Sequence, residues 1–97
     1  MNKNDLILAV ASESGIYKAD AARALDVILD MVTHALRRRD EVRLVGFGTF
    51  NVVNRNTKVG RDPRTGAKII IPASRQPRFK AGKVLKKLLN THPDLDR

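Results

Sequence analysis

The chain has 97 residues, enough for one small domain, and its 19 basic and 10 acidic side chains give a formal net charge of +9. A chain this short buries only about 60 to 65% of its unfolded surface, so we expect a second copy or a partner to add stability. It has no cysteine, which excludes disulfides and thiolate metal sites and favours a reducing compartment.

The positive charge is concentrated in one part of the sequence. Residues 1–50 carry seven basic and seven acidic side chains, whereas residues 51–90 carry eleven basic side chains and one acid, Asp62. This asymmetry predicts a surface that binds a polyanion. The N-terminus lacks the pattern of a signal peptide, and no run approaches the roughly 20 apolar residues of a membrane span. We therefore expect a soluble, cytoplasmic protein.

The first forty residues predict two helices. Asn2 is a suitable N-cap with Asp5 three residues later, and Gly15 is a typical C-terminal stop. From about residue 18 to 38, apolar residues recur along one stripe that includes Leu25 and Leu29. This is the strongest helical pattern in the chain.

Strand chemistry begins after Asp40. In the run EVRLVGFGTFNVV (residues 41–53), Gly46 and Gly48 indicate a bulge or close packing. The strand continues to the turn GRDPRTG (60–66) and returns through AKIIIPAS (67–74), and a short helix follows from about residue 81 to 90. The order of elements predicts an α+β fold with two N-terminal helices, a three-stranded antiparallel sheet and a C-terminal helix.

The hairpin is too long for the body of the molecule. An extended chain from residue 51 to 63 spans roughly 40 Å, whereas a globule of this length has a radius of gyration of about 12 to 13 Å. We therefore expect a protruding arm. Because an isolated two-stranded hairpin is marginally stable in water, the arm should be mobile until it contacts a partner.

The arm is strongly basic and ends in a proline. Its cations could protect exposed strand edges from aggregation, but the number of arginines favours a ribbon that follows a nucleic-acid groove. Pro63 is consistent with an ordinary turn and with an apolar wedge between base steps. The two interpretations are compatible, because the turn presents the ring.

Other conspicuous residues have simpler interpretations. The phenylalanines could stack on single-stranded bases, but a core shared across a dimer is favoured. The expected dimer core comprises Phe47, Phe50, Phe79, Leu29, Val32, Leu36 and Leu44. The arginines at 37–39 suit a helix C-terminus. His34 and His92 lack a neighbouring carboxylate or cysteine cluster, and no phosphate loop is present. We therefore expect no enzyme activity, cofactor, metal site or small-molecule substrate.

Several segments resemble a known family: GFGTF (46–50), Arg55, GRDPRTG (60–66), IPAS (71–74) and FKAGKVLKKLL (79–89). Over about residues 1–90 the chain resembles the bacterial HU and integration host factor family of DNA-bending, nucleoid-associated proteins, and it is most similar to HU. The resemblance implies an intertwined dimer in which helices form the base, a sheet forms a saddle and two arms reach around a duplex. The tail, residues 91–97, extends past the usual HU end.

The resemblance also implies roles for individual regions and residues. Residues 1–40 would form the helical dimerisation part, 41–80 the sheet and DNA-binding arm, and 81–90 the C-terminal helix of one domain. Pro63 would be the intercalating tip, the nearby cations would line the minor groove, and those further along would meet phosphates. The DNA-binding residues implied are Arg55, Lys58, Arg61, Pro63, Arg64, Lys68, Arg75, Lys80, Lys83 and Lys86.

Four positions depart from the family pattern. Asp62 stands where asparagine is usual and Lys58 where arginine is usual, whereas Arg39 replaces a helix-ending glycine and Tyr17 a serine-like N-cap. The first two bear on DNA affinity and the last two on local stability. In a flat strand Lys58 also points away from Arg55 and Arg61, so a twist or bulge must bring the three to one groove.

The leading hypothesis is a dimeric, largely sequence-independent protein of the bacterial nucleoid that binds double-stranded DNA and prefers bent, nicked or junction forms. One alternative is a subunit of a sequence-specific, host-factor-like heterodimer, because deformability can supply specificity that no base contact reveals. Another is an RNA-binding or ribosomal protein. A third is an arm that clasps another protein chain. The sequence leaves homodimer and heterodimer, preferred sites and bend angle open.

Overall fold

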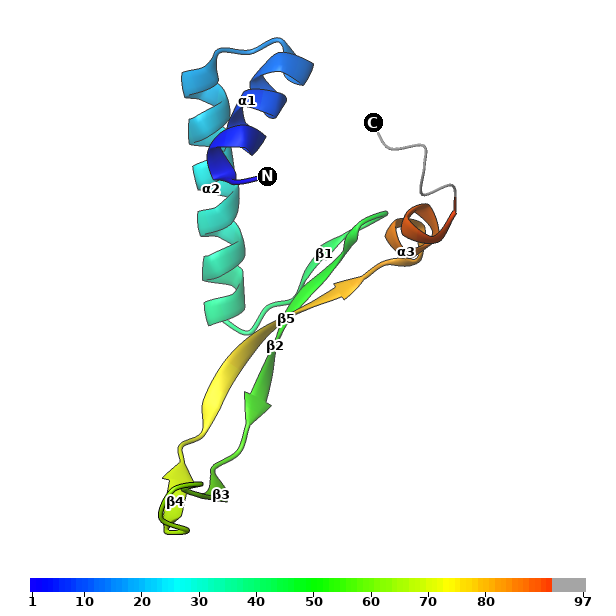
Figure 1. Cartoon of the computed structure of the whole chain (residues 1–97). Coiled ribbons are helices and arrows are strands. Elements are labelled where there is room, and N and C mark those ends of the chain that lie inside the picture. Colours follow the sequence, from blue (N-terminus) through cyan, green and yellow to red (C-terminus); the bar gives the residue numbers. More distant parts are fainter. Residues whose placement is uncertain (92–97) are drawn as a thin grey trace.

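The structure, a computed structural model, describes residues 1–91. Figure 1 shows the first two helices at one end of the molecule and an extended hairpin at the other. The last helix lies beside the end of the sheet that is away from the hairpin tip. The elements are α1 (Lys3–Ser14), α2 (Lys18–Arg37), β1 (Val42–Leu44), β2 (Gly48–Arg55), β3 (Lys58–Arg61), β4 (Lys68–Ile71), β5 (Ser74–Ala81) and α3 (Lys83–Asn90). The predicted α+β fold is confirmed. The tail beyond Thr91, with His92, lies outside the described residues.

Local sequence signals explain the start and end of α1. The Asn2 side chain accepts a hydrogen bond from the Asp5 amide at 2.9 Å, and the Asp5 carboxylate accepts one from the Asn2 amide at 3.1 Å. This capping box satisfies two amides that the helix leaves unpaired. Gly15 ends the helix in the left-handed region, with φ 68°. An ion pair between Lys3 and Asp26, at 2.6 Å, links α1 to α2.

Two boundaries differ from the expected ones. Gly46, with φ 86°, sits in a tight turn between β1 and β2 rather than in a bulge, because the Phe47 amide donates to the Leu44 carbonyl. Helix α3 begins two residues later than expected, since Ala81 still pairs with Gly48 in the sheet. Close packing at Gly48 is confirmed, because a Cβ there would lie 2.6 Å from the Phe79 ring.

The arm extends the central hairpin. Strands β1, β2 and β5 form an antiparallel sheet in the order β1-β2-β5. Pairing stops after Arg55 and Ser74, and it resumes in the separate β3–β4 ribbon. The radius of gyration is 19.2 Å and the longest dimension 58 Å, well beyond the roughly 12 to 13 Å radius of a globule of this length. The hairpin therefore projects as predicted.

One chain alone buries few of its apolar side chains. Of the residues that the structure describes, only Ile7 and Ala21 are buried among the apolar side chains. The rings of Phe47 and Phe50 lie 5.4 and 4.9 Å from that of Phe79, which is nevertheless 41% exposed. The remaining residues of the expected dimer core are half-buried or exposed, namely Leu29, Val32, Leu36 and Leu44. This apolar surface needs a second chain to cover it.

Candidate nucleic-acid interface

The tip of the arm is a turn held by Asp62. Its carboxylate accepts a hydrogen bond from the Arg64 amide at 2.8 Å, across Pro63. Its carbonyl accepts one from the Gly66 amide, also at 2.8 Å, and Gly66 adopts φ 71°. The Asp62 amide donates to the Ala67 carbonyl at 2.8 Å. Asp62, which departs from the family pattern, therefore shapes the loop that presents the exposed Pro63 ring.

The pairing register divides the arm cations between two faces. Cross-strand partners share a face of a ribbon, and successive residues alternate. Arg61 pairs with Lys68, so both lie on one face, whereas Lys58 pairs with Ile71 on the other. Arg55 ends β2, before the gap in pairing at residues 56–57. That interruption separates Arg55 from the β3–β4 ribbon and leaves the two segments free to differ in orientation.

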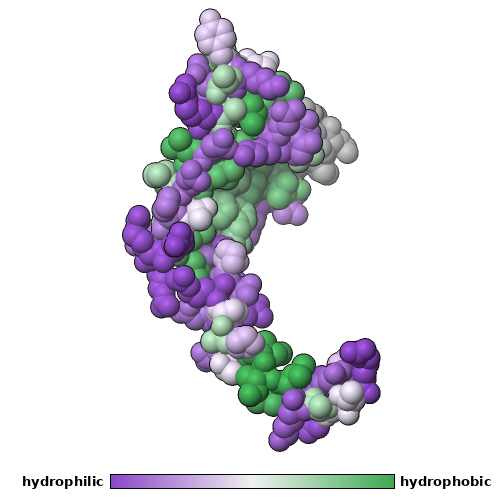
Figure 2. Space-filling view, turned by 90° about the vertical axis from the view of Figure 1, so that its left-hand side faces the viewer, coloured by the Kyte–Doolittle hydropathy of each residue, from purple (hydrophilic) through white to green (hydrophobic). Residues whose placement is uncertain are grey.

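The arm also carries an apolar band. Figure 2 shows hydrophobic residues gathered just short of the hydrophilic tip, on an arm that curves away from the body. Val59 and Ile70 are 70% and 73% exposed, and Ile69 and Ile71 are about half exposed. The last two close over Gly60, where a Cβ would meet Ile71 Cδ1 at 3.4 Å. A ribbon with apolar and cationic groups suits the sugar and phosphate walls of a groove.

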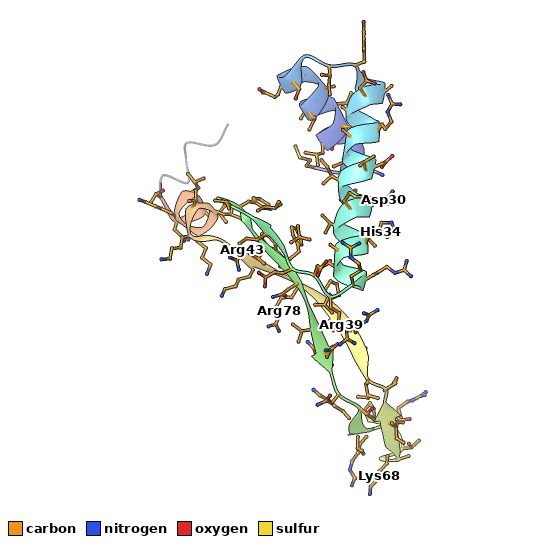
Figure 3. The ribbon with its side chains drawn as sticks, turned by 180° about the vertical axis from the view of Figure 1, so that it is seen from behind. Asp30, His34, Arg39, Arg43, Lys68 and Arg78 are labelled. Carbon is orange, nitrogen blue, oxygen red and sulfur yellow. The ribbon has the colours of Figure 1, made fainter. Side chains whose placement is uncertain are left out.

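A row of cations lies on the sheet face that points away from α2. Lys80 pairs with Thr49, which in turn pairs with Arg43, and Arg78 pairs with Asn51 two positions along. Figure 3 places Arg43 and Arg78 on the side of the sheet opposite α2. Arg43 was missed by sequence reasoning because it belongs to the neutral half of the chain. Its alignment with Thr49 and Lys80 across three strands is the signal that finds it.

A cationic hollow marks one end of this face. It has a volume of about 400 Å³ and is lined by Arg43, Thr49, Lys80, Ala81, Gly82, Lys83 and Lys86. Gly82 caps α3, and its amide donates to the Phe47 carbonyl at 2.9 Å. Lys83 begins the helix and no acid occupies its first turn, although a helix N-terminus favours negative charge. The arrangement therefore suits a bound phosphate, which both the lysines and the helix dipole attract.

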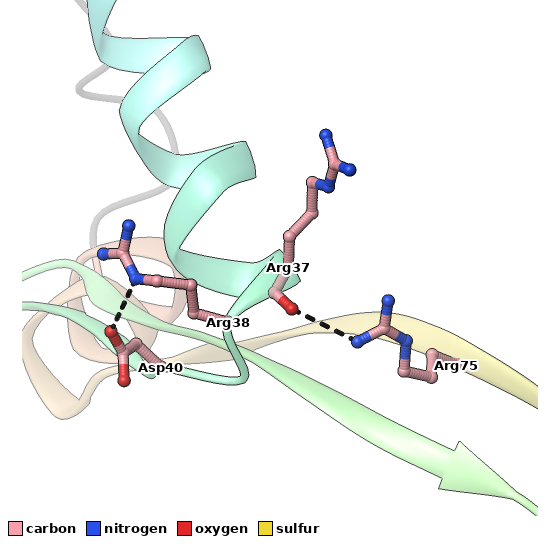
Figure 4. Close-up of polar contacts among 4 residues, drawn as sticks. All are labelled: Arg37, Arg38, Asp40 and Arg75. Atoms are coloured by element: carbon pink, nitrogen blue, oxygen red, sulfur yellow. Dashed lines mark hydrogen bonds and ion pairs between the residues drawn. The ribbon is translucent and has the colours of Figure 1, made fainter.

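Arg75 occupies a different position from the other predicted phosphate ligands. It shares the α2-facing side of the sheet with Val52 and Pro77, which line a hollow together with α2 residues. Its Nη1 donates to the carbonyl of Arg37, the last residue of α2, at 3.3 Å (Figure 4). The structure thus brings Lys80, Lys83 and Lys86 together and places Arg75 on the opposite face.

The described residues, 1–91, hold no candidate membrane span and no candidate metal-binding cluster. None of the helices there is long and apolar enough to cross a membrane. No group of three or more His, Asp or Glu side chains in that part of the chain could hold a metal ion.

Comparison with known proteins identifies relatives along almost the whole chain. Residues 1–90 match the family model described as bacterial DNA-binding protein. DNA-binding protein HU of Geobacillus stearothermophilus is 52% identical over 86 residues, which are 89% of this chain and 96% of that protein. DNA-binding protein HU-beta of Pseudomonas fluorescens is 50% identical over 90 residues, which are 93% of this chain and 100% of that protein.

Solved structures share the fold. The HU chain of the Anabaena HU–DNA cocrystal structure is 38% identical, with a TM-score of 0.87 over 94% of this chain and 99% of that chain. HU from Thermotoga maritima is 36% identical, with a TM-score of 0.68 over 93% of this chain and 100% of that chain. The chain therefore belongs to the family of bacterial DNA-binding proteins that includes HU.

Proposed function

We propose that two copies of this chain form an intertwined dimer that binds double-stranded DNA with little sequence specificity and bends it at the bacterial nucleoid. Residues 1–90 act as one DNA-binding domain, matching the extent of the family model. The observation that carries the proposal is the basic arm, which projects from a nearly neutral helical body.

The exposed core supports the dimer. A hollow of about 350 Å³ lies between α2 and the sheet, and it is lined by Thr33, Leu36, Arg37, Val52, Arg75 and Pro77. Next to it the phenylalanine cluster is only partly covered. A second chain that buries both surfaces supplies the apolar burial that one protomer lacks. The relatives named HU favour a homodimer over a subunit of a host-factor-like heterodimer.

The arms and the saddle divide the work of binding. The cations that contact the minor groove and its phosphates are Arg55, Lys58, Arg61, Arg64 and Lys68. Pro63, at the exposed tip, enters between base steps. Such an apolar wedge unstacks a step and kinks the duplex, which lets more protein surface reach the DNA. Phosphates on the sheet face that points away from α2 are bound by Lys80, Lys83, Lys86 and Arg43. The apolar band beside the tip packs against the sugars.

A binding series on linear, nicked and four-way-junction DNA across salt tests the function. If about 6 to 10 phosphates are neutralised, affinity falls by about 10³ to 10⁵ between 50 and 200 mM salt. Nicked and junction DNA should bind more tightly than the linear form, because part of the deformation is already made. A flat salt response, or tighter binding of duplex RNA than of any DNA form, would rule the proposal out.

A further inference from the structure

The turn at the tip of the arm fixes the Asp62 carboxylate beside the proposed wedge. Its Oδ1 accepts a hydrogen bond from the Arg64 amide at 2.8 Å. The backbone of Asp62 is held as well. Its carbonyl accepts from the Gly66 amide and its amide donates to the Ala67 carbonyl, both at 2.8 Å. Asp62 is half-buried, whereas Pro63 is exposed. The turn therefore presents the proline ring with a carboxylate at a fixed place next to it.

No cation within the described residues, 1–91, pairs with this carboxylate. Arg61 and Arg64 flank Asp62 in the sequence, but neither forms an ion pair with it. Arg61 instead donates from Nη1 to the Gly66 carbonyl at 3.2 Å. Asp62 Oδ2 accepts no hydrogen bond from the same part of the chain. A carboxylate has about four acceptor sites on its two oxygens, so most of them are available to a bound molecule.

The turn does not by itself explain an acid at this position. An asparagine oxygen accepts the same amide hydrogen bond and carries no charge. A negative charge beside the DNA backbone weakens binding by repulsion. A group on the DNA that donates a hydrogen bond to the carboxylate would offset this cost, because a hydrogen bond with one charged partner is stronger than a neutral one.

The minor groove offers such a donor at only one kind of base pair. A·T and T·A pairs present acceptors alone, adenine N3 and thymine O2, whereas a G·C pair adds the 2-amino group of guanine. A carboxylate only accepts hydrogen bonds. It therefore repels the acceptors of an A·T pair and attracts the amino group of guanine. The guanine 2-amino group is the minor-groove group that matches Asp62.

We propose that Asp62 gives the tip of the arm a preference for guanine. When Pro63 enters a base step from the minor groove, the Asp62 carboxylate accepts a hydrogen bond from the 2-amino group of a guanine beside that step. This inference rests on the proposed function, since the tip reaches the base edges only if Pro63 acts as a wedge. The preference is modest, because the other cations of the arm contact phosphates and sugars, which carry no sequence information.

The decisive experiment compares nicked duplexes that differ by one amino group. In one pair of duplexes, guanine beside the nick is replaced by inosine, which lacks the 2-amino group. In the other, adenine beside the nick is replaced by 2,6-diaminopurine, which carries that group. A nick is chosen because stacking is already interrupted there, which favours entry of the wedge at that step. The affinities of the unaltered protein and of Asp62→Asn are measured on all four duplexes by fluorescence anisotropy.

The preference for the amino group is compared between the two proteins. Loss of the group also changes how easily the DNA deforms, but this effect is common to both proteins and cancels in the ratio of their preferences. The unaltered protein should prefer the duplex with the amino group about two- to tenfold more than Asp62→Asn does, the range of one hydrogen bond. The excess should be found with guanine and with diaminopurine alike.

Asp30→Asn is the matched control, because it makes the same change of charge in the helical body. In Figure 3, Asp30 lies on α2, whereas Lys68 marks the far end of the arm. This variant should keep the preference of the unaltered protein.

Equal preferences in the unaltered protein and Asp62→Asn would overturn the proposal. An equal loss of preference in Asp30→Asn would show a general charge effect, and a preference for guanine without one for diaminopurine would assign it to another part of the base. Either result also overturns the proposal. Failure of the unaltered protein to bind any of the nicked duplexes would refute the proposed function, and this inference with it.

Discussion

The helical body and the arm distribute charge and apolar surface in opposite ways. In residues 1–43, seven acids balance seven bases, and some of them pair directly, such as Lys3 with Asp26 and Arg43 with Glu41. The arm has a single acid, Asp62, whose carboxylate is occupied by the turn. We therefore expect the body to assemble by apolar contact and the arm cations to bind a polyanion. Changes in one region should leave the function of the other largely intact.

Removal of a core ring should have the largest effect. Phe79→Ala takes away the ring that Phe47 and Phe50 both contact, and it opens a cavity against Gly48. We expect the free energy of unfolding to fall by about 3 to 5 kcal/mol. Thermal unfolding at several protein concentrations measures this loss together with dimer dissociation. A decrease below about 1 kcal/mol would mean that the ring is not part of a shared core.

Neutralisation of one face of the arm should affect DNA alone. Arg61→Ala with Lys68→Ala removes a cross-strand pair of cations. The slope of log affinity against log salt should become shallower by about two per arm. The free energy of unfolding should stay within about 0.5 kcal/mol, because both side chains are exposed and the hydrogen bond that Arg61 Nη1 donates to the Gly66 carbonyl, at 3.2 Å, is itself at the surface. An unchanged salt slope would show that this face does not touch phosphate.

Two substitutions at Asp62 distinguish its hydrogen bond in the turn from its negative charge. Asp62→Ala removes the acceptor for the Arg64 amide, a loss of about 0.5 to 1.5 kcal/mol of local stability, and bending should weaken. Asp62→Asn keeps an acceptor and removes a negative charge near DNA, so affinity should rise. Amide exchange at Arg64 reports the turn. Equal exchange in both variants would contradict the role of the side chain in the turn.

Introducing an N-cap side chain at the start of α2 should have the smallest effect on stability. Tyr17 is 82% exposed, and its side chain makes no capping hydrogen bond within the part of the chain that the structure describes. Tyr17→Ser supplies an oxygen for the first-turn amides and should stabilise the protein by about 1 kcal/mol. Calorimetry measures the gain, and the DNA affinity should not change. A loss of stability would indicate that the tyrosine ring is buried in the dimer.

Local signals in the sequence predict most of the fold. The capping residues of α1, the apolar stripe of α2 and the length of the hairpin each depend on neighbours along the chain, and the structure agrees with them. The local structure at Gly46 was harder to predict, because a tight turn and a bulge both use glycine. Only the pairing of Leu44 with Gly48 distinguishes them.

The candidate site was harder to predict where it depends on register. Arg43 joins the cation row only through Thr49, and Arg75 turns toward α2 only because its partner Asn54 lies on that face. The role of Asp62 depends on a hydrogen bond across the proline. Charge alone could not reveal any of the three, because each depends on which residues the sheet or turn brings together.

The bend angle of a nicked duplex, measured by fluorescence energy transfer between dyes at its ends, tests the central claim most directly. The unaltered protein should bring the ends closer together. Pro63→Ala should fold normally, bind DNA, and bend it less, because the wedge between base steps is lost. A Pro63→Ala variant with an unchanged bend angle would show that the proline only makes a turn, and no bending by the unaltered protein would contradict the proposed function.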